Sequence, residues 1–529
     1  MTNTVIHLKW EQIFYQVFYK IRNRVLDPIF FGDLKAYRSI QSRLKLNAFP
    51  FQPEATNIEP KEDELLKFTF LNLSHEFAVK VDWSYEEKGK LWNYNLNYFD
   101  FLFDSKMSPE LGEKLIRDYC DSYGSSKGSL EPYPISLRGI NWIKFLSINS
   151  IQNDQIDKCL YKQLKILDSN LEYHILANHL LENAFSMFFG AYYFENDDFY
   201  NKAKRLLMAQ LKEQILLDGA HFERSPMYHQ ILLFRLLDTI NLVQNNDWKS
   251  QELLTELREI AQSMLSWLDT ITFRNGEIPY LKDATKGIAP TTRELVAYAT
   301  MLGLDWIKDI PLLDSGYRKF INQRIELIVD VGSIAPSYQP GHAHADELNF
   351  VLNLEGKPFI VDVGISTYEK NARRQLERST ISHNCISLRN SNSSQVWGGF
   401  RVAKRAKVRL LKDAISEIEA EHTGFRNKGL VVRRNFRWNE NLIIIEDVLS
   451  DNSLLMDSAV STLHFHPDIQ LRISGNNIFA NDIRIKLSGF RSFALESYKY
   501  ASSFNRLKEA KKLVLKPSQK NQIEIRYAD

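Results

Sequence analysis

The sequence contains little cysteine, with three residues in a chain of 529. Cys120, Cys159 and Cys385 are far apart, and none belongs to a Cys-x-x-Cys pair. An odd number of widely spaced cysteines argues against a disulfide framework and against a thiolate zinc site. The chemistry of the chain must therefore be sought among its other side chains.

Long apolar runs are also missing, and none approaches the length of a membrane span. The first 25 residues lack the charged, apolar and small-residue regions of a secretory signal. By sequence we expect no transmembrane helix, no classical signal peptide and a cytoplasmic location. Segment 1–30 is expected instead to hold a docking helix, amphipathic over Trp10–Val25 with a basic end. Such a helix usually packs on its own protein, and a role at the membrane surface is the alternative.

Charge of one sign is not in excess, since the net charge is +2 and no basic block is present. Nucleic acid binding therefore has no electrostatic support. Hydrophobic residues make up 44% and charged residues 25%, which is ordinary for a soluble globular protein. A chain of this length is too long for one core, so at least two domains are expected.

The period of the apolar residues changes once along the chain. From about Trp10 to Asn322 they recur three and four apart, as in LLENAFSMFFGAYYF, which predicts helices separated by short turns. From about Ile325 they alternate, as in IELIVDVG and NLIIIEDVL, which predicts many antiparallel strands. We therefore predict an α+β chain, with an all-helical toroid or solenoid over 1–322 and an antiparallel β-sandwich over 323–529. Ligands favour the junction of two such domains.

The segment PGHAHAD is the most informative stretch of the sequence. His342, His344 and Asp346 alternate just before a strand-like run, so a strand would project all three from one face. Asp362 and His383 lie in similar surroundings further on. Imidazoles and carboxylates from neighbouring strands can build either a metal site or an acid–base site. A chance cluster of polar strand residues is the alternative.

The helical half carries two polar anomalies. In NHLLENAFS the polar side chains form one stripe on an otherwise apolar helix, namely Asn178, His179, Glu182, Asn183 and Ser186. The stripe either lines a cleft or forms a buried hydrogen-bonded network. The segment DGAHFERSPMYH is the second anomaly, where Ser225 is a candidate helix cap and Tyr228 would lie in the first turn.

These segments, taken in order, resemble the heparinase II/III-like polysaccharide lyases. YNLNYFDFL, PYPISLRGINWIKF, STYEKNARRQLERSTISHNCI and WGGFRVAKRAKV add to the resemblance, which runs from about Leu91 to the C-terminus. The family implies an incomplete (α/α) toroid followed by an antiparallel β-sandwich, in agreement with the change of period. It also implies an enzyme that acts on an anionic polysaccharide or oligosaccharide.

Such lyases cleave a uronic-acid-containing glycan by β-elimination, which removes the C5 proton and expels the O4 leaving group. The reaction needs a base, an acid and neutralisation of the uronate carboxylate. By resemblance, Asn178 and His179 neutralise the carboxylate, and Glu182 orients them. Tyr228 acts as base, acid or both, with His342 as its partner. Glu223 and Arg224 have supporting roles. A basic tyrosine needs positive neighbours to lower its pKa from about 10, and Arg224 and the histidines are the candidates.

The resemblance also implies one divalent metal ion, of zinc type, and no organic cofactor. Its ligands would be His344, Asp362 and His383, a plausible open zinc set that iron enzymes also use. We interpret the ion as structural, and metal-free packing of the same residues is the alternative.

Further side chains are candidates for the sugar groove. In the helical half they are Asn95, Tyr98, Arg138, Asn141 and Trp142, for which a buried network between helices is the other interpretation. In the strand half they are Arg378, Trp397 and Arg401, which belong to a cationic stretch that a solvated basic face explains equally well.

Two other functions compete with the lyase. A glycoside hydrolase would need paired carboxylates, drawn from Glu182, Glu223 or Asp346. A non-catalytic glycan-binding protein of polysaccharide assembly would use the same cleft. The expected lack of an export signal favours processing of a bacterial surface polysaccharide, such as a capsule or O-antigen chain.

Overall fold

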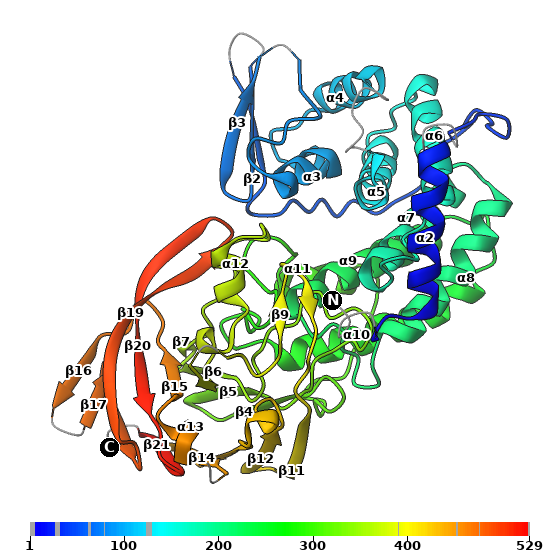
Figure 1. Cartoon of the computed structure of the whole chain (residues 1–529). Helices are drawn as coiled ribbons and strands as arrows, with labels where there is room; N and C mark the ends of the chain where they lie inside the picture. The colour runs from blue at the N-terminus through cyan, green and yellow to red at the C-terminus, as the bar shows by residue number, and fades with distance from the viewer. Residues whose placement is uncertain are drawn as a thin grey trace.

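The computed structural model describes residues 6–26, 32–61, 65–78, 80–122, 130–389, 391–450, 453–474 and 477–526. A helical half comes first and a half built of strands follows it (Figure 1). The longer helices are α2 (Trp10–Val25), α3 (Lys90–Tyr98), α4 (Pro109–Ser122), α5 (Pro132–Ile148), α6 (Asp154–Ser169), α7 (Ala177–Tyr193), α8 (Asp197–Gln214), α9 (Pro226–Asn245), α10 (Glu252–Ile271) and α11 (Thr292–Met301).

The helices form two layers, which confirms the predicted incomplete toroid. Helices α5, α7 and α9 are buried on nearly every side and pack against one another, as their almost uninterrupted apolar sequences require. Helices α6, α8 and α10 bury only one face and cover the inner helices from outside. Each inner helix contacts the outer helix that follows it in the chain.

Local sequence signals set where these helices begin. Ser225 precedes α9, and its Oγ accepts a hydrogen bond from the backbone N–H of Tyr228, as the predicted cap requires. Asn153 caps α6 and Asn196 caps α8 in the same way. Thr291 and Glu294 form a reciprocal capping box at α11.

The prediction of an all-helical segment from 10 to 322 is wrong in two places. Residues 57–77 form a three-stranded antiparallel sheet of β1 (Asn57–Pro60), β2 (Leu66–Phe70) and β3 (Leu73–Phe77). Its hairpin turns at Leu71 and Asn72, which both have positive φ and so make the tight turn that a two-residue hairpin needs. Strand β4 (Tyr317–Ile321) also begins before residue 322.

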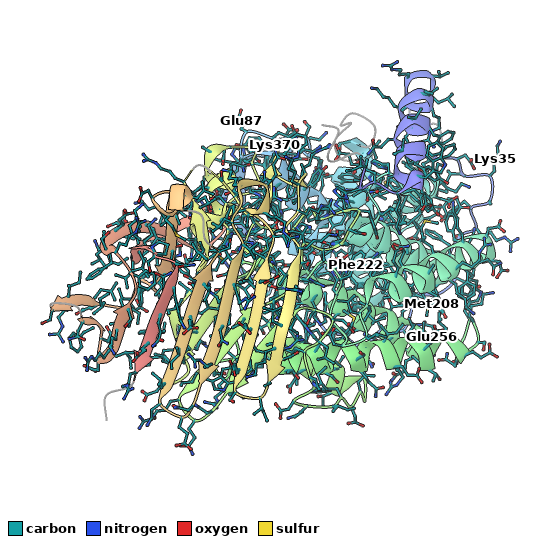
Figure 2. All side chains as sticks on the ribbon, turned by 60° about the horizontal axis from the view of Figure 1, so that its bottom comes forward. Lys35, Glu87, Met208, Phe222, Glu256 and Lys370 are labelled. Carbon is teal, nitrogen blue, oxygen red and sulfur yellow. The ribbon has the colours of Figure 1, made fainter. Side chains whose placement is uncertain are left out.

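The second half contains the predicted sandwich. One sheet has the order β11-β12-β13-β14-β21-β18-β17-β16, and its strands lie side by side in Figure 2. Two four-stranded sheets have the orders β4-β5-β6-β7 and β19-β20-β15-β8. Their strands are β4, β5 (Ile325–Asp330), β6 (Phe350–Leu354), β7 (Lys357–Ile360), β8 (Ile386–Leu388), β11 (Val408–Ala414), β12 (Glu417–His422), β13 (Val432–Trp438), β14 (Leu442–Leu449), β15 (Ala459–His464), β16 (Leu471–Ser474), β17 (Asn477–Ala480), β18 (Ile483–Ser488), β19 (Ser492–Ser503), β20 (Arg506–Lys516) and β21 (Lys520–Arg526).

The sheet that contains β5 and β6 is the middle layer of the molecule. Leu327 and Leu352 on one face belong to the sandwich core, whereas Ile328 and Val351 on the other face belong to the helical core. Because β5 is covered on both faces, its apolar residues run without alternation from Leu327 to Val329, between the buried Glu326 and Asp330. The functional side chains described below lie where this layer meets the helices.

The PGHAHAD segment is not a strand, contrary to prediction. Residues 342–346 form a loop, and β6 begins only at Phe350. Ala343 and Ala345 are buried together, so the chain still points its polar side chains away from that small core. The alternation that predicted a strand therefore reflects a loop that is buried on both sides, with its alanines in a small apolar cluster and its polar side chains in hydrogen-bonded contacts.

Candidate active site

A single buried carboxylate, that of Asp283, organises the centre of the site. Arg374 donates to both of its oxygens, at 2.5 and 2.6 Å. His342 Nδ1 donates at 2.9 Å and His344 Nε2 at 2.8 Å. Burial alone would raise the pKa of Asp283, but Arg374 and the two imidazole hydrogen bonds hold it well below its usual range. Asp283 is therefore a permanent anion that orients both histidines.

His342 joins the strand half of the chain to the first turn of α7. In the neutral ring, a proton on Nδ1 leaves a lone pair on Nε2. Asn178 Nδ2 lies 3.5 Å from this Nε2, and Glu223 Oε2 lies 3.5 Å from it. Glu223 in turn accepts from the backbone N–H of Asn178 at 3.2 Å and from its amide at 2.8 Å. The supporting role predicted for Glu223 thus corresponds to a contact that fixes the Asn178 amide.

Tyr228 lies against His342 from the first turn of α9. The two rings stack with their centroids 3.8 Å apart, and the Tyr228 hydroxyl lies 3.3 Å from the hydroxyl of Tyr368. Burial raises the pKa of Tyr228 above its ordinary value, although the hydrogen bond with Tyr368 opposes the rise. Tyr228 is therefore a neutral phenol near neutral pH, with its proton available to a ligand.

Arg224 does not lower the pKa of Tyr228, contrary to prediction. Its guanidinium donates to the backbone oxygens of Ser333 at 2.7 Å and Asp314 at 2.9 Å. These contacts fasten the loop before α9 to the chain around the first strands of the sandwich. Arg224 therefore supports the site through the backbone and not through charge.

His179 is oriented by Glu172, not by Glu182 as predicted. His179 Nδ1 donates to Glu172 Oε1 at 3.0 Å, and Asn183 holds the other oxygen of Glu172 at 3.0 Å. Burial opposes the charged ring, but Glu172 raises the pKa of His179 above its ordinary value. Its side chain is one-third exposed, and its ring packs on Tyr133 with centroids 4.6 Å apart.

The polar stripe on α7 divides between the candidate site and the buried interior of the toroid. The first turn, with Asn178 and His179, reaches the site. Further along, Glu182 lies 3.5 Å from Arg235 in a fully buried charge cluster, and burial raises the pKa of Glu182 to about 7. The stripe therefore passes from the site into a buried network inside the toroid.

Three inner helices begin at this site. Tyr133 lies in the first turn of α5, Asn178 in that of α7 and Tyr228 in that of α9. These side chains meet through His179 and His342. A helix N-terminus carries a partial positive charge, so three converging ones favour a ligand with negative charge.

The backbone is strained beside three of the functional groups. Leu176 (φ 65°) and Ala177 (φ 52°) precede Asn178, Lys282 (φ 58°) precedes Asp283, and Arg224 (φ 58°) precedes the cap of α9. A non-glycine residue at positive φ costs on the order of 1–3 kcal/mol and clusters at functional sites. Lys282 is anchored by Asp330 at 2.6 Å and Asp346 at 2.5 Å, which accounts for the third polar residue of PGHAHAD.

The groove residues predicted in the helical half are mostly buried. Arg138 donates to Gln163 and to the backbone oxygen of Asn97, and it is fully buried. Trp142 is also fully buried among aromatic rings, and Asn141 donates to Tyr98 O and Asp100 Oδ1. The buried-network interpretation is therefore correct for Arg138 and Asn141, whereas Trp142 is held by aromatic packing and its Nε1 has no hydrogen-bond partner among the described residues.

Tyr98 lies nearer the site, whereas a place for Asn95 in the groove stays a prediction. Asn95 is half-buried and donates to Leu91 O of its own helix. The ring of Tyr98 lies 5.9 Å from that of Tyr133, centroid to centroid. Tyr98 thus continues the aromatic wall that begins at Tyr133.

Of the groove residues predicted in the strand half, Arg378 is buried, Trp397 is partly exposed and Arg401 is exposed. Arg378 is fully buried and donates twice to Ala343 O, so it shapes the PGHAHAD loop and does not line a groove. Trp397 and Arg401 pair across β9 (Val396–Trp397) and β10 (Arg401–Val402), with the exposed Arg401 guanidinium 5.4 Å from the indole centroid. Phe400, next to Arg401, reaches within 6.2 Å of the His342 ring centroid.

The predicted metal ligands converge, but as a hydrogen-bonded network. The rings of His344 and His383 lie 5.3 Å apart, and His383 Nδ1 donates to Asp362 Oδ2 at 2.7 Å. Among the described residues, no group of three or more His, Cys, Asp or Glu side chains is arranged to hold a metal ion. Within the same residues, however, His344 Nδ1 and His383 Nε2 are buried without a hydrogen-bond partner. In neutral rings these atoms carry lone pairs, which are donors that suit zinc. The metal therefore stays a prediction.

Sequence reasoning missed Asp283, Glu172, Arg374 and Tyr368. Asp283 lies in the loop LKDATKG, which carries no periodic signal, and Glu172 lies in a short link between helices. Arg374 lies in the same cationic stretch as Arg378, and its sequence surroundings did not distinguish it further. The sequence offered one signal for these residues, which is a charged side chain in a loop next to a recognised motif.

The fold and the site define a class: an incomplete helical toroid and a β-sandwich that share a histidine, tyrosine and asparagine cluster at their junction. The family model for heparinase II/III N-terminus matches residues 135–302, and that for heparinase II/III-like, C-terminal matches residues 308–528. The chain belongs to the heparinase II/III-like family of polysaccharide lyases.

Solved structures of similar fold agree. A crystal structure of heparinase III is 16% identical, with a TM-score of 0.64 over 85% of this chain and 80% of that one. A heparan sulfate lyase, HepC, from Pedobacter heparinus is 16% identical, with a TM-score of 0.54 over 97% and 87%. A chondroitinase AC lyase is 9% identical, with a TM-score of 0.52 over 85% and 78%. A search of curated protein sequences finds no match.

Proposed function

We propose that this lyase cleaves a uronic-acid-containing glycan by β-elimination between His342 and Tyr228. The observation that supports this proposal is that His342 contacts Asp283 on one side and Tyr228 and Asn178 on the other. This arrangement offers a base, a proton donor and an amide at one point. Elimination needs these three groups together.

The protonation states favour a division of labour. His342 Nε2 accepts the C5 proton, and Asp283 stabilises the imidazolium that forms through its hydrogen bond to Nδ1. Tyr228 keeps its proton near neutral pH and donates it to O4 as the C4–O4 bond breaks. The electrons of the C5–H bond become the C4–C5 double bond, so atoms and charges balance.

The uronate carboxylate is the group that Asn178 and His179 would neutralise. Asn178 is held by Glu223, and the raised pKa of His179 favours its charged form. The N-termini of α5, α7 and α9 add partial positive charge at the same place. The negative charge that develops at C5 and on the carboxylate is then met by donors that are already oriented.

A hydrolase has less support. Each carboxylate that it could recruit is committed: Glu223 accepts from Asn178, Asp346 pairs with Lys282, and Glu182 lies beside Arg235. The paired carboxylates that flank a glycosidic bond in hydrolases are thus replaced by histidine, tyrosine and amide.

We also propose that one divalent ion binds between His344 and His383, with Asp362 as the third predicted ligand. The two unpaired ring nitrogens support this ion. It would hold the PGHAHAD loop against the segment that follows β7, and no step of the elimination passes through it.

The test of the function is a panel of uronate-containing polysaccharides followed by ultraviolet absorbance. Elimination creates a conjugated unsaturated uronate, whereas hydrolysis does not. Growth of that absorbance supports the lyase, and new reducing ends without absorbance would favour the hydrolase.

A further inference from the structure

Helix α2 exposes an apolar face to solvent. Six large side chains on this helix are between 42% and 79% exposed: Trp10, Phe14, Val17, Phe18, Ile21 and Val25. Their spacing of three and four residues puts them on one side of the helix. Together with Ile6 and Leu26 they make eight of the 18 large hydrophobic side chains that are exposed among the described residues. Single exposed apolar residues are ordinary, but a continuous apolar face marks an interaction surface.

The helix packs on the protein through its other face, and the contacts there are mostly polar. Gln12 Nε2 donates to Ile175 O at 3.0 Å, and Tyr19 Oη donates to Leu171 O at 2.7 Å. Arg22 donates to Ser169 O at 2.6 Å, and Tyr15 stacks on Tyr173. The helix does dock on its own protein, but its orientation is the reverse of the usual one, in which the apolar face turns inward. In both figures it lies at the outer edge of the helical half (Figures 1 and 2). The parts of the predicted docking segment at 1–5 and 27–30 lie outside the described residues.

Exposed cations border the apolar face. At about 100° per residue, Arg24 falls beside Val17, and Lys20 falls beside Ile13. Both cations are exposed, and Glu11 lies at the opposite border. A long basic side chain next to an apolar face can keep its charge in water while its stem covers apolar surface. The border therefore suits a partner that presents negative charge beside an apolar interior.

We propose that α2 lays this face on the surface of an anionic phospholipid bilayer. The apolar side chains would enter the boundary between headgroups and acyl chains, and the indole of Trp10 would lie at the polar interface. Arg24 and Lys20 would meet lipid phosphates. The helix would lie in the plane of the membrane, since none of the helices in the described part is long and apolar enough to cross one.

A second copy of the chain is a poorer occupant. A helix of 16 residues is about 24 Å long and about 10 Å wide. One face of it offers much less than the roughly 800 Å² per partner that a stable protein interface buries. A bilayer needs no matching surface, so a short apolar face with a cationic border is sufficient for it.

The experiment is sedimentation of the full chain with vesicles of phosphatidylcholine alone, or of phosphatidylcholine mixed with phosphatidylglycerol. Phe14→Ser combined with Ile21→Ser removes apolar area, and Lys20→Glu combined with Arg24→Glu reverses the border charge. Leu217→Ser is the matched control, because Leu217 is exposed but lies after the end of α8, away from this face. All these side chains are exposed, so the fold and the turnover of a soluble substrate should be unchanged.

The wild type should sediment with the anionic vesicles and much less with the neutral ones. Each double variant should bind the anionic vesicles about tenfold or more weakly, and Leu217→Ser should bind like the wild type. Absence of wild-type sedimentation with anionic vesicles would overturn the proposal, and so would equal loss in Leu217→Ser. A concentration-dependent dimer that the Phe14→Ser, Ile21→Ser variant dissolves, without vesicle binding by the wild type, would assign the face to a second copy.

Discussion

The Nδ1 of His342 lies 2.9 Å from Oδ2 of Asp283, so a loop of the strand half is tied to the loop between α10 and α11. Asp283 thereby sets the tautomer of His342, with the lone pair of Nε2 facing Asn178. Asp283→Asn should keep the size of the side chain but lose the anion that Arg374 and both histidines need. We expect kcat to fall by about 10²-fold or more, on the scale seen when a buried carboxylate that orients a catalytic histidine is neutralised.

The matched control is Asp447→Asn. Asp447 is equally buried and accepts two hydrogen bonds from Arg434, at 2.7 and 2.9 Å, in the sandwich. This variant should lower Tm, while kcat per folded molecule stays near the wild-type value. If the two variants lose the same small part of kcat, Asp283 only stabilises the fold.

Tyr228 should matter for turnover and not for folding. Tyr228→Phe keeps the ring on His342 and removes the proton donor, so kcat should fall by about 10²-fold or more with little change in Tm. Tyr368→Phe removes the hydroxyl that lies 3.3 Å from that of Tyr228, and it should cost less in kcat. Steady-state kinetics on the identified substrate decide this, and full turnover by Tyr228→Phe would remove it from the mechanism.

The pair of His179 and Glu172 should make substrate affinity depend on pH. The folded pKa of His179 is raised above its unfolded value of about 6.5, because Glu172 stabilises the charged ring. The stability from this pair is therefore fully present below pH about 6.5 and is lost as pH rises through the folded pKa. In the proposed mechanism the charged ring also binds the uronate carboxylate, so KM should rise over the same window.

Glu172→Gln removes the cause of that shift. In this variant, KM should begin to rise at lower pH than in the wild type. The difference in unfolding free energy between wild type and variant should shrink as pH rises. If the dependence of KM on pH is the same in the two proteins, His179 does not bind the uronate carboxylate.

The strained turn before Asn178 gives a test of backbone geometry. Ala177 has φ 52°, a region that glycine enters without strain, so Ala177→Gly should leave Tm unchanged or raise it. Ala184→Gly is the control in the middle of the same helix, where it should cost about 1 kcal/mol. Equal loss of Tm in both variants would mean that no strain is stored at Ala177.

The metal proposal predicts different outcomes for substitutions of His383 and His342. Elemental analysis of purified protein should find close to one divalent transition metal per chain. His383→Ala should lose the ion and lower Tm, whereas His342→Ala should keep the ion and lose activity. A metal-free wild type with full activity would exclude the ion, and loss of metal from His342→Ala would mean that the two roles are exchanged.

The sequence predicted the helical half and the half built of strands, because the spacing of apolar residues depends on which faces of a helix or strand are buried. The change from a period of three to four to a period of two predicted a helical half followed by a half built of strands. The hairpin at Leu71 and Asn72 was missed, because each strand is five residues long and too short for a periodic signal. PGHAHAD was mistaken for a strand, because a loop with alternating buried alanines has the same pattern.

The site was predictable only where motifs concentrate unusual side chains. Tyr228, His342, Asn178 and His179 were found because polar residues stood out in apolar or capped segments. Asp283 and Glu172 lie in irregular loops, and their roles depend on long-range packing that no local pattern encodes. Arg138 and Asn141 resembled binding residues, because a buried hydrogen-bonded side chain and a ligand-binding one have the same sequence appearance.

The central claim is that His342 and Tyr228 perform an elimination on a uronate. The most direct measurement is the ultraviolet absorbance of products from a uronate polysaccharide, with wild type, His342→Ala and Tyr228→Phe compared at equal folded concentration. The account predicts growing absorbance from an unsaturated uronate with the wild type, and a loss of about 10²-fold or more in each variant. Cleavage by the wild type that produces reducing ends without this absorbance would contradict it.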